Sequence, residues 1–304
     1  MKMNRPKMFV LFFLIAHGGG LALALLFPDA WHDPSGLQKA VGVLHLLPVL
    51  LATLVVQGPI LKQPILEPLG LKLRPSRYWL IAWLAPLVVL GVGLGVSATL
   101  GHDLILDAAS YIARKRASLD PEMLPRFDEM VEQSPPGSPL SFIGPGLLAG
   151  VTLNLLLGLA TEIGWRGFLF REVQGGFWRR SLLIGLAEAT YFAPILALGY
   201  FFGDPATGLA AMSLWCIAVS PVLVYLRARS GSVLPVAVFR GTVLALTAVA
   251  ADLTTAPSAI RPFFGAAGTA GVLVLLLGVI IHDRFCDEKL VFPKEKKKAS
   301  APAG

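Results

Sequence analysis

The chain has 304 residues, of which 55% are apolar and only 15% are charged. Water-soluble domains carry about 25% charged residues, so this balance excludes an ordinary soluble protein and indicates a membrane protein. The 26 lysines and arginines exceed the 19 aspartates and glutamates by 7, and their grouping in loops indicates membrane topology instead of nucleic-acid binding. Two cysteines are too few for a disulfide framework or a thiolate metal site.

Eight apolar runs have the length that a bilayer core about 30 Å thick requires of a spanning helix. In chain order they are residues 8–27, 40–56, 78–100, 142–163, 181–202, 210–226, 233–251 and 265–281. Backbone groups in lipid must form hydrogen bonds within their own segment, and the alternation of a barrel strand is absent. The runs therefore predict an all-α, polytopic integral membrane bundle of about eight transmembrane helices.

The first run, residues 8–27, follows Lys2, Arg5 and Lys7 and precedes a small residue, Ala30, as in a cleaved signal peptide. Its apolar part is longer than the roughly 7 to 15 residues usual in a signal, which favours a retained membrane anchor. Either interpretation leaves the orientation of the later helices unchanged.

The lysines and arginines are divided unequally between the two sides of the predicted bundle. Nineteen lie at the termini and in the loops on the same side as the termini. Six lie on the other side, namely Lys39, Arg114, Lys115, Arg116, Arg126 and Arg261. Because positively charged loops stay in the cytoplasm, both termini are predicted to be cytoplasmic, in a bacterial inner membrane or an equivalent compartment.

Two stretches outside the apolar runs divide the chain into three parts. Residues 1–141 hold the first three helices and an extracytoplasmic loop, 101–141, in which apolar residues recur at helical spacing. This loop is predicted to form a helix at the membrane interface, with a lid over the bundle as the alternative. Residues 142–284 hold helices four to eight, and 285–304 are predicted to be a basic, disordered cytoplasmic tail.

Charged side chains at membrane depth are costly, so each one is a candidate functional residue. They are Glu162, Glu188, Arg240 and Asp252, with His17, His45 and Asn154 as uncharged polar candidates. No two histidines share a helix face at the spacing of metal ligands, so a metal site built on histidine pairs is not predicted.

The most specific stretch is residues 161–169, with the sequence Thr-Glu-Ile-Gly-Trp-Arg-Gly-Phe-Leu. Glu162 and Arg166 are four residues apart on one helix face and can form an ion pair, which is a purely structural role. The stretch also resembles the first motif of the CPBP family of intramembrane endopeptidases, which includes CAAX proteases and bacteriocin-processing proteins. That motif is Glu-Glu-x-x-x-Arg, commonly continuing as Trp-Arg-Gly, and here Thr161 replaces its first glutamate.

Two further motifs of the family have counterparts on later helices. The family's Phe-x-x-x-His aligns with the segment from Glu188 to Phe192, so phenylalanine stands where histidine is expected. The family's third motif is His-x-x-x-Asn or Asp, preceded by Gly-Ser-x-Leu-Pro. Its counterpart follows residues 231–235, with Arg240 in the histidine position and Leu244 in the last.

The resemblance, which covers roughly residues 142–251, implies a peptidase in which glutamates and histidines activate a water, with or without a divalent metal such as zinc. Phe192 can neither accept a proton nor bind a metal, Leu244 cannot form a side-chain hydrogen bond, and Arg240 stays protonated. A carboxylate beside a permanent cation is also a weaker base. Because the expected metal ligands are missing, the active site is interpreted as degenerate.

From these residues we expect Arg240 to form a buried ion pair with Glu162 or Glu188, which neutralises charges that lipid penalises. The chain is then a catalytically impaired membrane scaffold or accessory protein. Its expected partners are the lipid bilayer and a membrane-embedded or lipid-modified protein or peptide, or an active protease of the same family. No nucleic-acid partner is expected.

Two other functions remain open. The first is an active intramembrane endopeptidase that uses Glu162 with partners outside the family's motifs, such as Glu188, His45 or Asn154. It requires Glu162 and Glu188 to face one cavity. The second is a transporter or channel, in which the buried charged residues and Asp252 line a polar path through helices interrupted by prolines.

Overall fold

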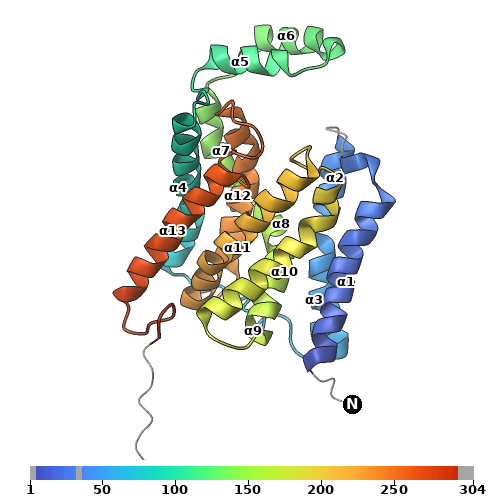
Figure 1. Ribbon diagram of the computed structural model, residues 1–304, viewed down its shortest axis with the longest axis vertical. Helices are drawn as coiled ribbons and strands as arrows, with labels where there is room; N and C mark the ends of the chain where they lie inside the picture. The colour runs from blue at the N-terminus through green and yellow to red at the C-terminus, as the bar shows by residue number, and fades with distance from the viewer. Residues whose placement is uncertain (1–4, 32–35, 294–304) are drawn as a thin grey trace, which may run out of the picture.

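The computed structural model describes residues 5–31 and 36–293 of the chain. Apart from an isolated bridge between Leu104 and Thr254, the regular structure of these residues is helical throughout. The prediction of an all-α, polytopic membrane bundle is confirmed (Figure 1).

Each of the eight predicted runs coincides with one or two helices of the described residues. These are α1 (Arg5–Leu26), α2 (Gly36–Leu44) with α3 (Leu47–Val55), α4 (Arg77–Thr99), α7 (Ile143–Gly150) with α8 (Leu153–Glu162), α10 (Phe177–Ala197), α11 (Pro205–Ser230), α12 (Leu234–Asp252) and α13 (Ala266–Arg284). Shorter elements connect them, namely η1 (Asp29–Trp31), the π-helix η2 (Val56–Ile60), α5 (Ala108–Ala117), η3 (Pro121–Met123), α6 (Leu124–Gln133), η4 (Pro139–Phe142), the π-helix η5 (Ile163–Leu169) and α9 (Phe170–Glu172). The helices therefore fall where the length of apolar sequence predicted them.

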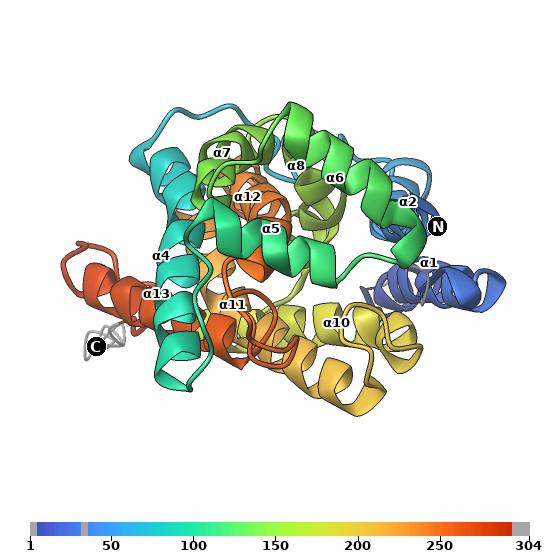
Figure 2. The same cartoon turned by 90° about the horizontal axis from the view of Figure 1, so that it is seen from above.

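Fewer of these helices qualify as membrane spans than predicted. Six described helices are long and apolar enough to cross a membrane, and a seventh is gained if the bent pair Pro139–Gly150 and Leu153–Glu172, which turns by 57°, counts as one span. The remaining predicted run corresponds to α10, which carries Arg179, Arg180 and Glu188. These charges lower its mean hydropathy, although α10 lies alongside α11 within the bundle (Figures 1 and 2).

The first and last long helices show that both described ends of the chain lie at one end of the bundle. Helix α1 begins and α13 ends there, whereas α5 and α6 lie across the opposite end (Figures 1 and 2). Neither α5 nor α6 has a buried residue. Their attachment to the bundle includes an ion pair of 2.7 Å between Lys115 and Asp252, and Arg114 donates to the carbonyl of Thr254. Asp252 therefore pairs at the end of α12, away from the other buried charges.

Two large apolar clusters form the core of the described bundle. One joins α4, α10, α11, α12 and α13 and includes Trp215 and Phe239. The other joins α1, α3, η5 and α10 around Phe12, Trp165 and Tyr191. Helix α10 contributes to both clusters, so it fixes the position of η5 relative to α11 and α12.

The segment after α13 differs in part from the prediction of a disordered tail. Asp283 accepts hydrogen bonds from the backbone amides of Leu290 and Val291, at 3.0 to 3.2 Å, and Val291 is buried. A carboxylate on α13 therefore holds residues 290 and 291 against the bundle. Residues 294–304, which include the lysine run of the predicted tail, lie outside the described residues.

Candidate functional site

Close packing of α8 against α12 places the first and third motifs beside each other. A Cβ atom at Gly158 of α8 would lie 2.5 Å from the carbonyl oxygen of Ala237 on α12. A Cβ atom at Gly241 of α12 would lie 2.6 Å from the carbonyl oxygen of Asn154 on α8. Small residues let membrane helices approach backbone to backbone. The two glycines therefore allow Arg240, which precedes Gly241, to reach the end of α8.

The π-helix η5 carries the arginine of the first motif into the bundle. The whole of η5 is buried, and a Cβ atom at Gly167 would lie 3.1 Å from the carbonyl oxygen of Leu69. Arg227 of α11 donates from Nε to the carbonyl of Arg166 at 3.0 Å. Short π-helical segments occur frequently at functional sites. This local geometry holds Arg166 in place from both sides of η5.

Four charged side chains from α8, η5, α10 and α12 meet in what we term the charge tetrad, which consists of Glu162, Arg166, Glu188 and Arg240. Arg166 Nη1 lies 3.2 Å from both carboxylate oxygens of Glu162 and 2.6 Å from Glu188 Oε2. Arg240 Nε donates to Glu162 Oε1 at 3.0 Å, and Arg240 Nη2 donates to Glu188 Oε1. All four carboxylate oxygens therefore accept a hydrogen bond from a guanidinium group.

The charge tetrad is enclosed and its formal charges cancel. Glu162 and Arg166 are 0% exposed, Glu188 is 1% exposed and Arg240 is 7% exposed. Burying a single charge costs several kcal/mol, and only close pairing with further hydrogen bonds offsets that cost. We expected Arg240 to pair with Glu162 or with Glu188, and in the structure it pairs with both.

The remaining motif positions add no acid, base or charged group to the tetrad. Thr161 is buried, and its hydroxyl donates to the carbonyl of Gly158 at 3.1 Å, within its own helix. Phe192 is half-buried and packs against the apolar clusters, and Leu244 is half-buried on α12. These positions contribute packing where the family's motifs place polar groups.

The other polar candidates from the sequence lie outside the charge tetrad. His45 is 1% exposed and stacks on Tyr191, with 4.6 Å between ring centroids, and neither of its ring nitrogens has a hydrogen-bond partner among the described residues. His17 Nε2 lies 3.2 Å from the carbonyl oxygen of Ala187 and 3.1 Å from Thr190 Oγ1. Both histidines therefore belong to the aromatic packing between α1, α3 and α10.

A divalent metal does not fit the charge tetrad. Its only donors to a metal are the carboxylates of Glu162 and Glu188, and both are already bound by permanently protonated guanidinium groups, which repel a cation. No group of three or more His, Cys, Asp or Glu residues that could hold a metal occurs among residues 5–31 and 36–293. The donor set disagrees with the zinc that the resemblance implies.

Sequence reasoning missed two kinds of residue that build the site. Arg227 was assigned to a cytoplasmic loop, yet it is 9% exposed and binds the backbone of η5. The packing role of Gly158 and Gly241 was also missed, although a glycine directly after Arg240 is a usable signal for close helix approach.

Comparison with known proteins identifies a family for part of the chain. Residues 143–246, from α7 to α12, match the family model described as Rce1-like, type II CAAX prenyl endopeptidase Rce1-like. This match supports the resemblance of the segment to the CAAX proteases of the CPBP family. The Rce1-like segment contains the whole charge tetrad and all three motif positions. No curated protein matches the chain.

Proposed function

We propose that this protein is a non-catalytic, Rce1-like membrane scaffold that binds a membrane-embedded or lipid-modified protein. The observation that carries the proposal is the charge tetrad. A motif that in the family activates water here consists of two carboxylates, each oxygen of which accepts a hydrogen bond from one of two guanidinium groups. An arrangement of this kind leaves neither carboxylate free to act as a base, and removal of one partner is strongly destabilising.

The chemistry of peptide hydrolysis requires a base that can take a proton from water. Each oxygen of Glu162 and Glu188 already accepts a hydrogen bond from Arg166 or Arg240, and both glutamates are enclosed. Arginine cannot act as the base because it stays protonated. Phe192 and Leu244 offer no replacement, so residue type and geometry together support the proposed loss of catalysis.

The choice of partner rests on the family and the membrane setting. The family description names a prenyl endopeptidase, whose substrates are lipid-modified, and the chain is an integral membrane bundle. A bundle that keeps this fold but lacks the base retains a surface for such a chain, or for an active protease of the same family. The basic residues at one end of the bundle support an orientation with that end in the cytoplasm, in a bacterial inner membrane or an equivalent compartment.

A cleavage assay tests the loss of catalysis. The detergent-purified full chain, Glu162→Ala and Arg240→His are each incubated with membrane-spanning and prenylated peptides that an active family member cuts. We expect no product from any of the three. Product from the native chain that disappears in Glu162→Ala would overturn the proposal.

A binding assay tests the scaffold role itself. A photo-crosslinkable prenylated peptide and the same peptide without its prenyl group are offered to the native chain in nanodiscs. We expect cross-linking of the prenylated peptide at least about tenfold above the unmodified peptide, since each buried methylene contributes roughly 0.8 kcal/mol. Equal cross-linking of both peptides contradicts a site for lipid-modified proteins.

A rewired peptidase is the second candidate. One observation favours it, because Glu162 and Glu188 both contact Arg166 Nη1 and therefore lie close together. Two neighbouring carboxylates can share a proton and divide the roles of acid and base. The same cleavage assay decides between the two candidates.

A further inference from the structure

An apolar groove lies between α4, α11 and α13, away from the charge tetrad. Its volume is about 350 Å³, which is within the range of small-molecule pockets. Apolar side chains line most of it, among them Ile81, Val88, Val222, Leu226, Val274 and Leu275. The ring of Tyr225 and the imidazole of His282 line its polar end.

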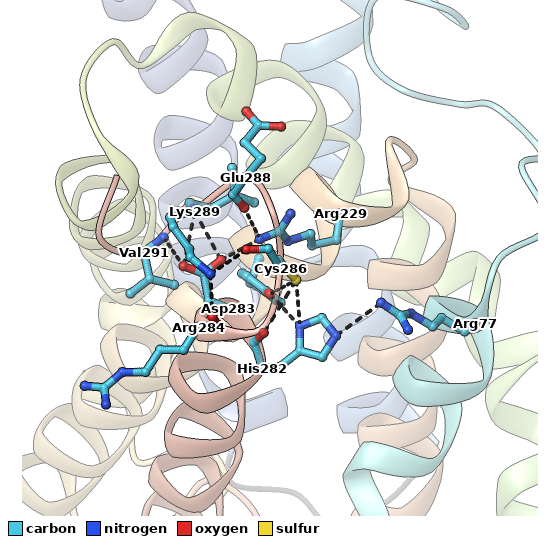
Figure 3. A network of polar contacts seen from close by, with 11 residues as sticks. Arg77, Arg229, His282, Asp283, Arg284, Cys286, Glu288, Lys289 and Val291 are labelled. Carbon is cyan, nitrogen blue, oxygen red and sulfur yellow. Dashed lines mark hydrogen bonds and ion pairs between the residues drawn. The ribbon is translucent and has the colours of Figure 1, made fainter. Parts of the chain in front are cut away.

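A polar network forms this end of the groove (Figure 3). Arg77 Nη2 lies 3.3 Å from His282 Nε2, and the hydroxyl of Tyr225 lies 2.7 Å from His282 Nδ1. When Arg77 donates to Nε2, the ring proton is on Nδ1 and is donated to Tyr225. The Tyr225 hydroxyl then accepts a hydrogen bond from His282 and can donate its own proton to another group. Cys286 Sγ lies 3.9 Å from this hydroxyl and is a weak acceptor.

Arg77 is a cation of this network that lies beside the groove and has no carboxylate partner among the described residues. No Asp or Glu oxygen lies within ion-pair distance of Arg77 in the part of the chain that the structure describes, and its side chain is exposed. Arg229, by contrast, is paired with Asp283 at 2.5 Å. Arg77 also begins α4, and Ser76 forms no side-chain cap there. The amide of Trp79 donates to the carbonyl of Ser76 at 3.1 Å, which leaves the amides of Arg77 and Tyr78 for an anion at this point.

The groove opens onto a surface that lipid chains cover. Helices α4 and α13, which form its sides, are both long and apolar enough to cross a membrane. Large apolar side chains on these helices are exposed, including Leu80 and Leu84 on α4 and Leu273 and Leu277 on α13. An acyl chain can therefore enter the groove sideways from the bilayer.

We propose that this groove is a binding site for an anionic phospholipid, with an acyl chain between α4, α11 and α13 and the phosphate on Arg77. The Tyr225 hydroxyl donates a second hydrogen bond to the phosphate, and His282 holds Arg77 in position. Charge complementarity at Arg77 and the apolar lining below it together select a charged headgroup with a hydrocarbon tail. The site is independent of the proposed scaffold function.

Native mass spectrometry of the full chain tests the proposal. Delipidated protein is titrated with phosphatidylglycerol and, separately, with phosphatidylcholine, and bound lipid is counted. We expect phosphatidylglycerol to bind at least about fivefold more tightly, because one arginine near a membrane contributes roughly 1 kcal/mol. Arg77→Ala should remove this preference, and Tyr225→Phe should weaken binding of both lipids, because both carry the phosphate that the hydroxyl contacts.

Groove-filling variants test the acyl chain. Gly278 lines the groove, and a Cβ atom added there meets nothing within 4 Å, so Gly278→Leu fills the space without a clash. We expect it to remove high-affinity binding of both lipids. Matched controls are Gly95→Leu, which also meets nothing within 4 Å but lies outside the groove, and Arg74→Ala, which removes a neighbouring exposed arginine. Both should bind lipid as the native chain does.

Four results would overturn the lipid site. The first is an unchanged preference in Arg77→Ala, and the second is unchanged lipid binding in Gly278→Leu. The third is displacement of phosphatidylglycerol by inorganic phosphate at equal concentration, which means that the acyl chain adds nothing. A dimer of the chain that Gly278→Leu disperses assigns the groove to a second copy and also contradicts the proposal. Circular dichroism melting of each variant confirms that it is folded.

Discussion

At the scale of single residues, Arg240 has the largest effect on the character of the site. It supplies a hydrogen bond to each glutamate, whereas Arg166 reaches both through one nitrogen, Nη1. Removal of either arginine leaves one uncompensated negative charge in an enclosed space, and removal of either glutamate leaves one positive charge. Every single substitution in the tetrad therefore carries a cost that the matching double substitution partly recovers.

A double-mutant cycle between Arg240 and Glu162 measures this coupling. We expect Arg240→Ala and Glu162→Ala each to lower the free energy of unfolding by about 3 to 5 kcal/mol, because each leaves an unpaired buried charge. The double variant should lose clearly less than the sum of the two. Reversible unfolding in mixed detergent provides the measurement.

An exposed ion pair provides the control for that cycle. Arg116 and Asp128 are 2.6 Å apart, but their side chains are 58% and 42% exposed. Exposed pairs contribute about 0 to 1 kcal/mol, so Arg116→Ala should have little effect. Additive losses for Arg240→Ala and Glu162→Ala would contradict the coupling across the tetrad.

At the scale of elements, the approach of α8 and α12 determines whether the tetrad can form. These two helices belong to different parts of the chain, and their contact depends on the missing side chains of Gly158 and Gly241. The bend of 57° between α7 and α8 directs the end of α8 and η5 into the bundle. The tetrad is thus a consequence of helix packing as much as of residue identity.

Gly158→Leu tests the packing of α8 and α12. Its Cβ would lie 2.5 Å from the backbone oxygen of Ala237 and 2.9 Å from the backbone nitrogen of Gly241, so the helices must separate. We expect a loss of about 1 to 3 kcal/mol or more, measured by thermal melting in detergent. Gly144→Leu on α7 is the matched control, because a Cβ there meets nothing within 4 Å. Equal melting of the two variants argues against the packing role.

At the scale of the whole molecule, the two ends of the bundle contain different helices and different polar groups. One end holds the first residues of α1, the end of α13 and the polar network beside Arg77, and the other holds α5 and α6 (Figures 1 and 3). By the positive-inside rule, the unequal division of basic residues predicts that the first end is cytoplasmic.

Cysteine labelling tests this orientation. In a cysteine-free background made with Cys216→Ala and Cys286→Ser, we expect a membrane-impermeant maleimide to label Ser118→Cys, beside α5, from outside the cell. Gly176→Cys, just before α10, should react only after the membrane is opened. Both residues are exposed, so access is decided by the membrane. Labelling of both positions from the same side contradicts the predicted topology.

The features that could be predicted from the sequence are those that depend on residues close together in the chain. Apolar length is a property of a continuous segment, so the eight runs predicted the positions of the helices. Residue type at the motif positions, above all Phe192, Arg240 and Leu244, predicts a degenerate active site, and the cleavage assay tests that prediction. The spacing of four between Glu162 and Arg166 predicted their pairing, because neighbouring helical turns bring such residues together.

Tertiary structure alone decided how the remaining charges meet. Glu188 and Arg240 are far from Glu162 in the chain, so the sequence left open which glutamate Arg240 binds, and only the packing of α8, α10 and α12 brings both within reach. The burial of Arg227 and the placing of Arg77 beside the groove are likewise contacts between distant segments. Hydropathy and motif spacing describe one segment at a time, whereas an enclosed charge is stabilised only by partners that the whole fold brings to it.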